Sequence, residues 1–467
     1  MRSMLRILAV AVLAGALACG RGSDGGSAGG SGGGSAGGSG GGSAGGSGGG
    51  SAGGSGGGSA GGSGGGSAGG SGGGSAGGLG GGSAGGSGGG SAGGSGGGSA
   101  GGSGGGSPSD AGTIDLDGGT TIVVMQPISG TPSPTTSALQ GPGTVLMGGG
   151  TDVDAAFVWM HDTVAGSASA HLGNLVVLRA DDNTDNAYTP YIYALAPFQS
   201  VMTIYLGGAG GSGPPATAAD LAIAADYIDR ADILFFAGGD QADYVSWKGT
   251  AVTQAAARLL ARGGVIGGTS AGCAIQGPFV FDSVAADAAG GADVATADAV
   301  ANPFESTISF TRGMLSNPAL PGVITDMHFV TRDRMGRLAA FVARQYADGA
   351  ATSGVLGVGI DESNALLVDK NGKATLVQQS GGTEASSGSG AYIFQPAQAA
   401  DTCVAGSPLL YKNVSVTRLS NPATDSFDFS RGCGSGKLFS FTVDGSSSSS
   451  PYSHNPYTTA GSATSCP

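Results

Sequence analysis

The chain has 467 residues, 100 of them glycine, and its 19 basic and 32 acidic residues give a net charge of −13 at neutral pH. This excess of negative charge argues against a nucleic-acid-binding protein, because the phosphate backbone repels it, and it favours solubility. A cationic substrate is compatible with the charge, but a solvated acidic surface is the simpler explanation.

The first 18 residues have the composition of an export signal. Two arginines precede an apolar run at 7–18 that is too short to span a membrane. Two processing routes stay open, because Ala16-Leu17-Ala18 fits the A-x-A pattern of a signal-peptidase site and Cys19 stands where a bacterial lipoprotein carries its lipid. We favour lipidation of Cys19, which would be the only membrane contact, and expect an exported protein that is secreted or held at the outer membrane or cell surface.

Residues 19–107 form a low-complexity tract rich in glycine and serine. Most of it, from 25 to 106, repeats the eight residues GGSGGGSA and is interrupted once, by Leu79. The repeat has no apolar side chains to bury, and glycine loses more backbone entropy on ordering than any other residue. We therefore expect a flexible tether with an end-to-end distance of roughly 50 Å. Stacking of the repeats is not expected, because no unit has a hydrophobic face.

Alternating strands and helices follow a β-prone lead-in at 108–142. The expected strands are continuous apolar runs without polar alternation, which is typical of a parallel sheet covered on both faces. Thr217 is the expected N-cap of the third helix. The expected strands cover 143–150, 174–180, 200–206, 232–239 and 264–268, and the expected helices cover 152–166, 188–197, 217–231 and 249–264.

Three of these strands end in glycines, at 148–150, 238–239 and 267–268. Ligands of open parallel sheets bind beyond the carboxyl ends of the strands, and glycine allows the backbone to approach closely there. We therefore expect the active site at this edge of the sheet.

The second half of the chain is less regular. A polar insertion at 282–306 is expected to form an exposed loop, and the stretches 354–369 and 373–380 are expected to pair as strands around an Asn-Gly turn. We assign 143–400 to one catalytic domain and 401–467 to a β-rich C-terminal extension. A further strand is expected at 322–330 and a helix at 334–349.

A serine enclosed by glycines is the candidate nucleophile. The residues Gly268-Thr269-Ser270-Ala271-Gly272 match the pattern G-x-S-x-G at the junction of an expected strand and a helix. Small neighbours permit the sharp turn that exposes the Ser270 hydroxyl, and the backbone N–H of Ala271 can help to bind an oxyanion.

A serine nucleophile needs a base and an acid. Of the four histidines, His328 is the best candidate, because it lies at the end of an expected strand on the same edge as Ser270. Asp361 and Glu362 follow the next strand, and either can orient the imidazole. The order serine, histidine, acid separates the chain from the α/β-hydrolases, in which the acid precedes the histidine. The other histidines are His161, His171 and His454.

Four motifs carry a resemblance to a known family. They are FFAGGDQ at 235–241, GGTSAGCAI at 267–275, TDMHFVTRDRMGRL at 325–338 and GIDESNAL at 359–366. In this order they resemble the cyanophycinase and aspartyl-dipeptidase family of serine peptidases, which is related in fold to the class I glutamine amidotransferases. The resemblance covers 143–380 and, more faintly, 413–429. It implies an α/β fold in which a mostly parallel sheet is flanked by helices.

The resemblance implies a role for each candidate residue. Ser270 is the nucleophile, His328 the base and Glu362 the orienting acid, with Asp361 as its rival. The implied oxyanion donors are the backbone N–H groups of Ala271 and of Gly239 or Asp240.

The resemblance also places an aspartyl substrate against a set of polar side chains. Arginines grip carboxylates with two parallel hydrogen bonds, so three arginines near the base independently suit a β-aspartyl or poly-aspartate substrate. The chain departs from the family pattern at Met327, where glutamine is usual. This departure bears on the choice of cyanophycin as the substrate more than on hydrolysis as the reaction. The chain also has Cys273 where alanine is usual. The implied substrate-binding residues are Gln241, Asp326, Arg332, Arg334 and Arg337.

We expect an exported serine peptidase that hydrolyses aspartyl peptide bonds through an acyl-enzyme, and most specifically cyanophycin to β-aspartyl-arginine dipeptides. An aspartyl dipeptidase or a general peptidase of the same family is one alternative, and a surface-tethered binding protein that has lost turnover is another. No cofactor or metal is expected, because serine, histidine and acid supply the chemistry. The oligomeric state stays open, with a homodimer as one alternative.

The cysteines bear on the same prediction of export. In an oxidising compartment one disulfide is expected among Cys403, Cys433 and Cys466, without a choice of pair. Cys273 is expected to pack as a small apolar residue.

Overall fold

A computed structural model of the chain describes residues 137–466 apart from 181–187, 208–214, 292, 316 and 381–387, together with residues 132 and 135 and the short strands that precede them. The chain divides into two units, Met1–Gly104 and Gly105–Pro467. The expected signal at 1–18 and Cys19 lie outside the described residues. In the part of the chain that is described, no helix is long and apolar enough to cross a membrane.

Short parallel strands occur along the glycine-rich tract of the first unit. They are β1 (Ser35–Gly37), β2 (Ala44–Gly45), β3 (Ser51–Gly53), β4 (Ala60–Gly61), β5 (Ser67–Gly69), β6 (Ala76–Gly77) and β7 (Ala84–Gly85). The odd-numbered strands pair in one sheet and the even-numbered strands in another, two repeats apart, so that Ser35 lies beside Ser51. The sequence does not predict this pairing, because a ladder needs only the backbone groups that every residue carries. The flexible tether stays a prediction, since most of 19–107 lies outside the described residues.

Five parallel strands form the centre of the second unit. In spatial order they are β12 (Ser200–Tyr205), β11 (Asn174–Arg179), β13 (Ile233–Phe236), β14 (Val265–Thr269) and β10 (Gly143–Met147). Their apolar residues are buried on both faces, as in β11, where Leu175 and Val177 join one core and Val176 and Leu178 the other. This explains the continuous apolar runs of the sequence and confirms the predicted parallel sheet.

Antiparallel strands extend this sheet at both edges. β9 (Thr120–Met125) pairs with β12 and forms a hairpin with β8 (Gly112–Leu116), inside the β-prone lead-in. At the opposite edge, β19 (Asn364–Val368) pairs with β10, and β20 (Lys373–Gln378) pairs with β19.

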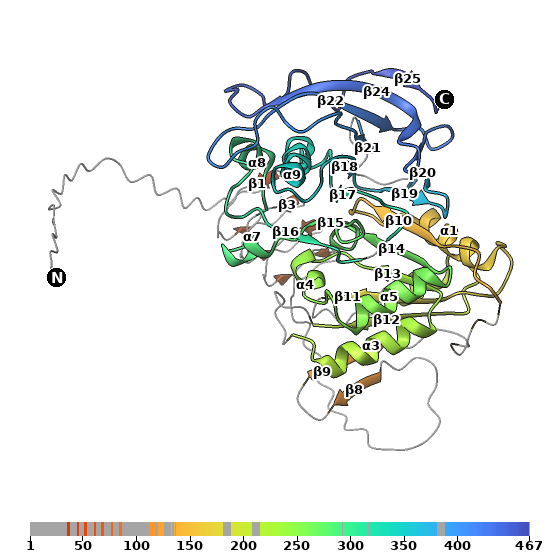
Figure 1. Cartoon of the computed structure of the whole chain (residues 1–467). Coiled ribbons are helices and arrows are strands. Elements are labelled where there is room, and N and C mark those ends of the chain that lie inside the picture. The colour runs from red at the N-terminus through yellow and green to blue at the C-terminus, as the bar shows by residue number, and fades with distance from the viewer. Residues whose placement is uncertain are drawn as a thin grey trace, which may run out of the picture. The chain divides into compact units, whose positions relative to one another are not determined.

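Helices cover both faces of the parallel strands (Figure 1). α3 (Ala218–Arg230) and α5 (Ala251–Ala261) lie side by side on one face, and α1 (Asp154–Ala165) packs on the other, with α2 (Tyr188–Tyr193) near the edge strand β12. Thr217 caps α3 as predicted. The Thr217 hydroxyl accepts a hydrogen bond from the Asp220 N–H, and the Asp220 carboxylate accepts one from the Thr217 N–H.

A second, mixed sheet follows. β15 (Phe279–Phe281), β17 (Val323–Asp326) and β18 (Leu356–Ile360) run parallel, and β16 (Phe310–Arg312) and β21 (Ala391–Phe394) are antiparallel to them. α9 (Met335–Ala347) packs against β17 and β18.

The insertion at 282–306 is not the exposed loop that the sequence predicts. It contains α7 (Val284–Ala288) and α8 (Thr296–Ala301), and α8 packs against α9. Four apolar residues spaced along this polar segment are buried in the same core as α9, which is enough to fold it onto the domain. They are Ala286, Val294, Ala299 and Val300.

The stretch 354–369 is two strands, where the sequence predicts one. Three polar residues, 361–363, separate β18 from β19, and Ser363 turns the chain with a φ of 58°. β18 pairs with β17 and β21, whereas β19 pairs with β10 and β20. The predicted Asn-Gly turn between β19 and β20 is present, with Gly372 at a φ of 82°.

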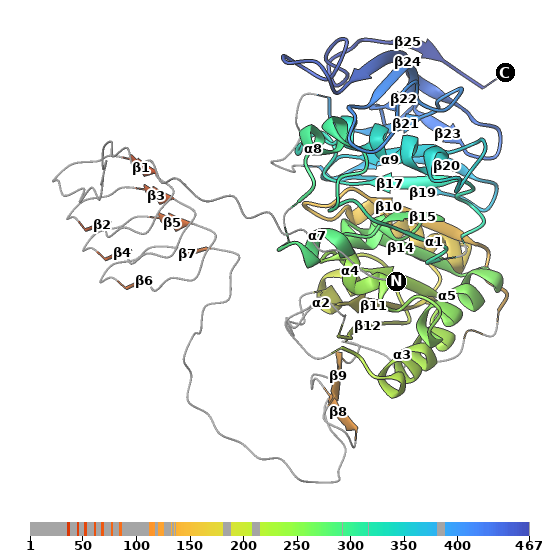
Figure 2. The same cartoon turned by 60° about the vertical axis from the view of Figure 1, so that its left-hand side comes forward.

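The C-terminal extension is β-rich, as predicted. β22 (Leu410–Leu419), β24 (Cys433–Asp444) and β25 (Ser462–Thr464) continue the second sheet beyond β21, and β23 (Ser426–Asp428) pairs with both β20 and β24. These strands lie at the end of the second unit opposite α3 (Figures 1 and 2).

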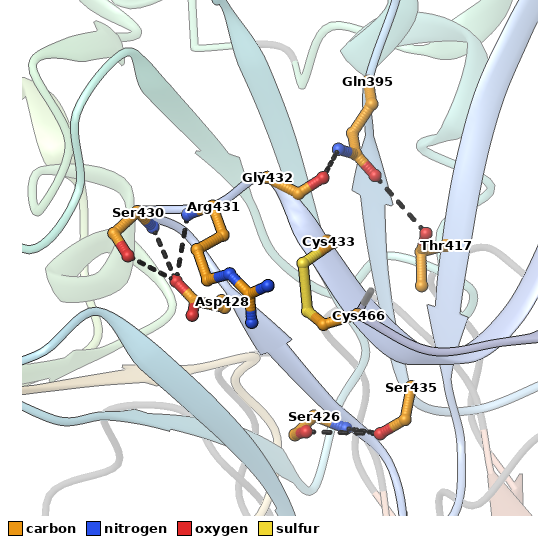
Figure 3. Close-up of a disulfide and its surroundings, with 10 residues drawn as sticks. All are labelled: Gln395, Thr417, Ser426, Asp428, Ser430, Arg431, Gly432, Cys433, Ser435 and Cys466. Atoms are coloured by element: carbon orange, nitrogen blue, oxygen red, sulfur yellow. Dashed lines mark hydrogen bonds between the residues drawn. A yellow bond between two sulfur atoms is a disulfide. The ribbon is translucent and has the colours of Figure 1, made fainter.

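One disulfide anchors the end of the extension. It joins Cys433, at the start of β24, to Cys466, which follows β25 (Figure 3). The turn before Cys433 is held by the Asp428 carboxylate, which accepts backbone hydrogen bonds from the next residues. Cys403 and Cys273 are free thiols, and Cys273 is fully buried in an apolar core. The structure thus selects one of the cysteine pairs that the sequence left open.

Candidate active site

Ser270 lies on a sharp turn between β14 and α6 (Ala271–Ala274). Its φ of 50° and ψ of −120° are strained for a residue other than glycine, and a turn of this kind exposes the side chain of a nucleophile. The flanking glycines are needed for space. A Cβ on Gly268 would lie 2.3 Å from the carbonyl oxygen of Gly272, and one on Gly272 would lie 2.1 Å from that of Phe236.

His328 follows β17 and meets Ser270 at the end of the first sheet. Its Nε2 lies 2.8 Å from Ser270 Oγ, and its backbone N–H donates to the Gly148 carbonyl oxygen at 2.8 Å. Gly149 has a φ of 92°, and a Cβ there would lie 2.4 Å from Cε1 of the His328 ring. The glycines that end β10 therefore leave room for the imidazole, which is the close approach that the sequence predicts at this edge.

Glu362, on the connection between β18 and β19, is the carboxylate that contacts His328. Nδ1 of His328 donates to Glu362 Oε1, and each of the two side chains is 11% exposed. Asp361, the rival in the sequence, accepts hydrogen bonds from the backbone N–H groups of Val330 at 2.9 Å and Thr331 at 3.0 Å. It therefore holds the chain that follows His328, whereas Glu362 is the carboxylate hydrogen-bonded to the ring.

Burial lowers the pKa of His328 below its ordinary 6.5. The Glu362 carboxylate opposes this shift, and the positive charges of Arg332 and Arg334 add to it. The imidazole is therefore neutral at pH 7, and because Nδ1 donates to Glu362, Nε2 is left to accept the proton of the Ser270 hydroxyl.

The expected oxyanion donors surround the same turn. Ala271 is the first residue of α6, and Gly239 and Asp240 lie between β13 and α4 (Gln241–Val245). A Cβ on Gly238 would lie 3.7 Å from Cβ of Ser270, so the end of β13 is close to the serine. The structure thus brings the turn after β13 close to the serine turn, with Gly239 and Asp240 lining the same pocket as Ser270.

A pocket of about 160 Å³ opens beside Ser270 and His328. Its wall carries charges of both signs, and Gln241, at the start of α4, donates there to the Ser283 hydroxyl. Met327, which replaces the family's usual glutamine, also lines it. The charged lining residues are Asp240, Asp287, Asp293, Arg332, Arg334 and Arg337.

The arginines of the pocket differ in how far they are already engaged. Arg337 is 1% exposed and binds the Asp326 carboxylate through two hydrogen bonds of 2.7 and 2.8 Å, with a further one to Asp293 at 2.7 Å. Arg334 donates to Asp293 at 2.6 Å and to the Met327 carbonyl oxygen at 2.9 Å. Its buried Nε has no hydrogen-bond partner among the described residues.

Arg332 is the exposed member of this group. Its side chain is 48% exposed and comes only within 3.8 Å of the Asp293 carboxylate. Asp326, by contrast, is 2% exposed and is not among the residues that line the pocket. Of the five substrate-binding residues predicted from the sequence, Arg332 is therefore exposed at the pocket, and Asp326 lies behind it. The other three line the pocket while engaged in hydrogen bonds to protein groups; they are Gln241, Arg334 and Arg337.

The insertion brings acidic residues to the pocket that are not predicted from the sequence. Asp293 forms ion pairs with all three arginines. Burial raises its pKa, but the charges and hydrogen bonds of Arg337 and Arg334 outweigh burial and lower the pKa below its ordinary value. Burial, followed by repulsion from Asp240, raises the pKa of Asp287 to about 6. Charge balance was the available signal, because three arginines within 332–337 require carboxylates and the insertion is rich in aspartate. Among the described residues, no group of three or more His, Cys, Asp and Glu side chains is placed to hold a metal ion.

Comparison with known proteins places the chain near one family. No family model matches it. Two curated proteins, the cyanophycinases of Trichormus variabilis and of a Nostoc species, are each 32% identical to it over 141 residues. The chain is a homologue of cyanophycinase. The match spans 30% of this chain and 40% of each cyanophycinase, and it bears out the resemblance that the four motifs carry.

Two solved structures are also similar to this cyanophycinase homologue. A peptidase from an acI-B1 actinobacterium is 14% identical, with 52% of this chain and 89% of that chain covered and a TM-score of 0.34. A putative peptidase E protein from Listeria monocytogenes is 13% identical, with 51% and 100% covered and a TM-score of 0.32. The fold is defined by the strand pairing described above.

Proposed function

We propose that this cyanophycinase homologue is a serine peptidase that hydrolyses aspartyl peptide bonds. The observation that carries the proposal is the continuous hydrogen-bonded series from Ser270 through His328 to Glu362, at the wall of a pocket that contains the exposed Arg332.

The geometry suggests how each residue acts. The Ser270 hydroxyl attacks the carbonyl carbon of the substrate while Nε2 of His328 takes its proton, and Glu362 keeps the ring oriented and stabilises the imidazolium. The backbone N–H groups of Ala271 and of Gly239 or Asp240 stabilise the oxyanion. His328 then protonates the leaving amine, and water hydrolyses the acyl-enzyme by the same route.

The charges of the pocket point to the substrate class. Arg332 is suited to bind the free carboxylate of an aspartyl residue, because its side chain is 48% exposed at the pocket, and Arg334 adds positive charge to the same wall. Asp240 and Asp287 suit a guanidinium. Cyanophycin, whose cleavage gives β-aspartyl-arginine, offers both groups, so we propose it as the most specific substrate. Because Met327 is apolar where the family usually has glutamine, aspartyl dipeptides remain the alternative substrates.

Export and lipidation of Cys19 belong to the same proposal. An enzyme that acts on a polymer outside the cell gains reach from a long tether between a lipid anchor and the catalytic domain. Incorporation of labelled palmitate into the wild-type chain, and its absence from a Cys19→Ala variant, would support this part. An unlabelled wild-type chain in the culture medium would favour secretion.

The decisive experiment compares the full chain with its Ser270→Ala variant. Each is incubated with cyanophycin and with β- and α-aspartyl dipeptides, and the products are followed by mass spectrometry. Release of β-aspartyl-arginine that depends on Ser270 supports the proposal, and cleavage of dipeptides alone shifts it to an aspartyl dipeptidase. If neither is cut, the chain is better described as a surface-tethered binding protein that has lost turnover.

A further inference from the structure

Two tyrosines of the C-terminal extension reach back to the start of α9. Both lie in the segment between β24 and β25. The hydroxyl of Tyr457 accepts a hydrogen bond from the Met335 N–H at 3.0 Å and donates to the Asp333 carboxylate at 2.8 Å. The hydroxyl of Tyr452 accepts from the Gly336 N–H at 3.1 Å and donates to the same carboxylate oxygen at 2.8 Å. We call Tyr452 and Tyr457 the tyrosine clamp.

The clamp replaces the usual cap of a helix. The first N–H groups of a helix have no acceptor within it, and a side chain at the N-cap normally accepts one of them. The N-cap residue of α9 is Arg334, which makes no side-chain cap hydrogen bond. Two phenol groups from far along the chain supply the missing acceptors, and Asp333, at a φ of 47°, fixes the direction of both hydroxyls.

The clamped residues are continuous with the candidate base. The N–H of Arg332 donates to the carbonyl oxygen of His328 at 2.9 Å, and the N–H of Arg334 donates to that of Phe329 at 2.9 Å. His328, Arg332 and α9 therefore belong to one tight hydrogen-bonded turn. The ring of Tyr457 also packs edge-on against the ring of Phe329, with centroids 6.3 Å apart. Asp333 is thus linked to His328 through one continuous run of hydrogen-bonded backbone.

The clamp is itself held by the extension. Arg418, on β22, donates to the Tyr457 carbonyl oxygen at 2.6 Å, and the ring of Tyr452 packs against Phe441 of β24. The segment then continues into β25 and ends at Cys466, which the disulfide fastens to Cys433. Strands, a hydrogen bond from an arginine and a disulfide therefore fix the position of two hydroxyl groups.

We infer that the C-terminal extension positions the base for the reaction. In this reading Tyr452 and Tyr457 are positioning residues that act through Asp333 and the start of α9, and the extension is a working part of the active site. The inference rests on the proposed serine-peptidase function for its kinetic consequence.

The test uses the full chain and its double variant Tyr452→Phe/Tyr457→Phe, with Tyr411→Phe as the matched control. Tyr411 is a buried tyrosine of the same extension whose hydroxyl donates to the Gln398 carbonyl oxygen and not to Asp333 at the start of α9. A fluorophosphonate probe, which phosphonylates an activated serine with loss of fluoride, measures the reactivity of Ser270 without a natural substrate. Amide hydrogen exchange of peptides covering 328–340 measures the clamp directly.

We expect the double variant to label at least about tenfold more slowly, since small misplacements of a base have large kinetic effects. Its amides at Met335 and Gly336 should exchange faster, and the pH midpoint of labelling should rise toward the ordinary histidine value as the contacts of His328 loosen. The control should match the wild type in all three measurements. If the double variant does not fold, the two single variants are measured in the same way.

The outcomes separate the two proposals. If the wild type labels at Ser270 and the double variant labels equally fast with the same pH midpoint, the positioning role is wrong. If the wild type does not label at Ser270 at all, the serine-peptidase proposal fails instead, and the exchange rates alone then decide whether the clamp holds the start of α9.

Discussion

Replacing Gly149 by alanine perturbs the position of the base without changing any residue of the proposed triad. A Cβ at this position would lie 2.4 Å from Cε1 and 2.6 Å from Nε2 of His328, whereas ordinary contact begins at 3.4 Å. The ring must therefore move by about 1 Å, which disrupts the 2.8 Å hydrogen bond to Ser270. A misplacement of about 1 Å costs on the order of 100-fold in rate. We expect fluorophosphonate labelling of Ser270 to slow by about this factor.

Gly249→Ala is the matched control for this prediction. Gly249 also has a positive φ, 76°, but a Cβ there meets nothing within 4 Å. Both substitutions force alanine into left-handed backbone at a cost of about 1–2 kcal/mol, so both should lower the thermal unfolding midpoint. Only Gly149→Ala should lose labelling. A folded Gly149→Ala variant that labels at the wild-type rate would refute the position assigned to the His328 ring.

Three further predictions follow from the contacts already described. Glu362→Gln should lower kcat on the best aspartyl substrate by about 10³- to 10⁴-fold with little change in KM, because a neutral amide neither fixes the tautomer of the base nor stabilises its imidazolium; a loss below tenfold would contradict the role. Since the reaction needs neutral His328 and burial lowers its pKa, kcat/KM should fall only as the pH drops below 6.5, so that more than half of the maximum remains at pH 6.5; a midpoint above 6.5 would show the opposite shift. Replacing Cys433 and Cys466 by serine should lower the free energy of unfolding, measured by denaturant titration, by about 3–4 kcal/mol, because the disulfide closes a loop with a sequence separation of 33 residues. In the same measurement Cys403→Ser, which removes a free thiol, should change the free energy of unfolding by less than about 1 kcal/mol.

The parts of the fold that the sequence predicts are those in which burial leaves a continuous pattern. Strands such as β11 are apolar on both faces, so the parallel sheet is visible in the sequence, and the capping threonine Thr217 marks the start of α3 in the same local way. The insertion at 282–306 is misread because its few buried residues are spread among polar ones and find their partners on α9. The break inside 354–369 is missed because β18 and β19 are both apolar and only their partners differ.

The candidate site likewise has parts that the sequence predicts and parts that only the structure shows. The serine turn is a local motif, and the steric need for glycine beside it can be inferred from the sequence. The choice between Asp361 and Glu362 requires knowing which side of a turn each faces, which only the structure gives. The tyrosine clamp is beyond sequence reasoning for a simpler reason, since it acts on residues 333–336 from a distant part of the chain. Asp293 is also distant from its arginines, and the charge balance of the insertion is the signal that the sequence offers for it.

The sheet pairings also decide when in folding the serine can become reactive. Ser270 ends a strand that pairs with β10 and β13, whereas His328 follows a strand that pairs with β15 and β18. The two side chains come within hydrogen-bond distance only after the first and second sheets have docked, and Glu362 sits on the short connection from one to the other. In a chain in which only one of the two sheets has formed, the serine is not activated. The moment at which probe reactivity appears during refolding therefore reports when the two sheets dock, and not when either sheet forms.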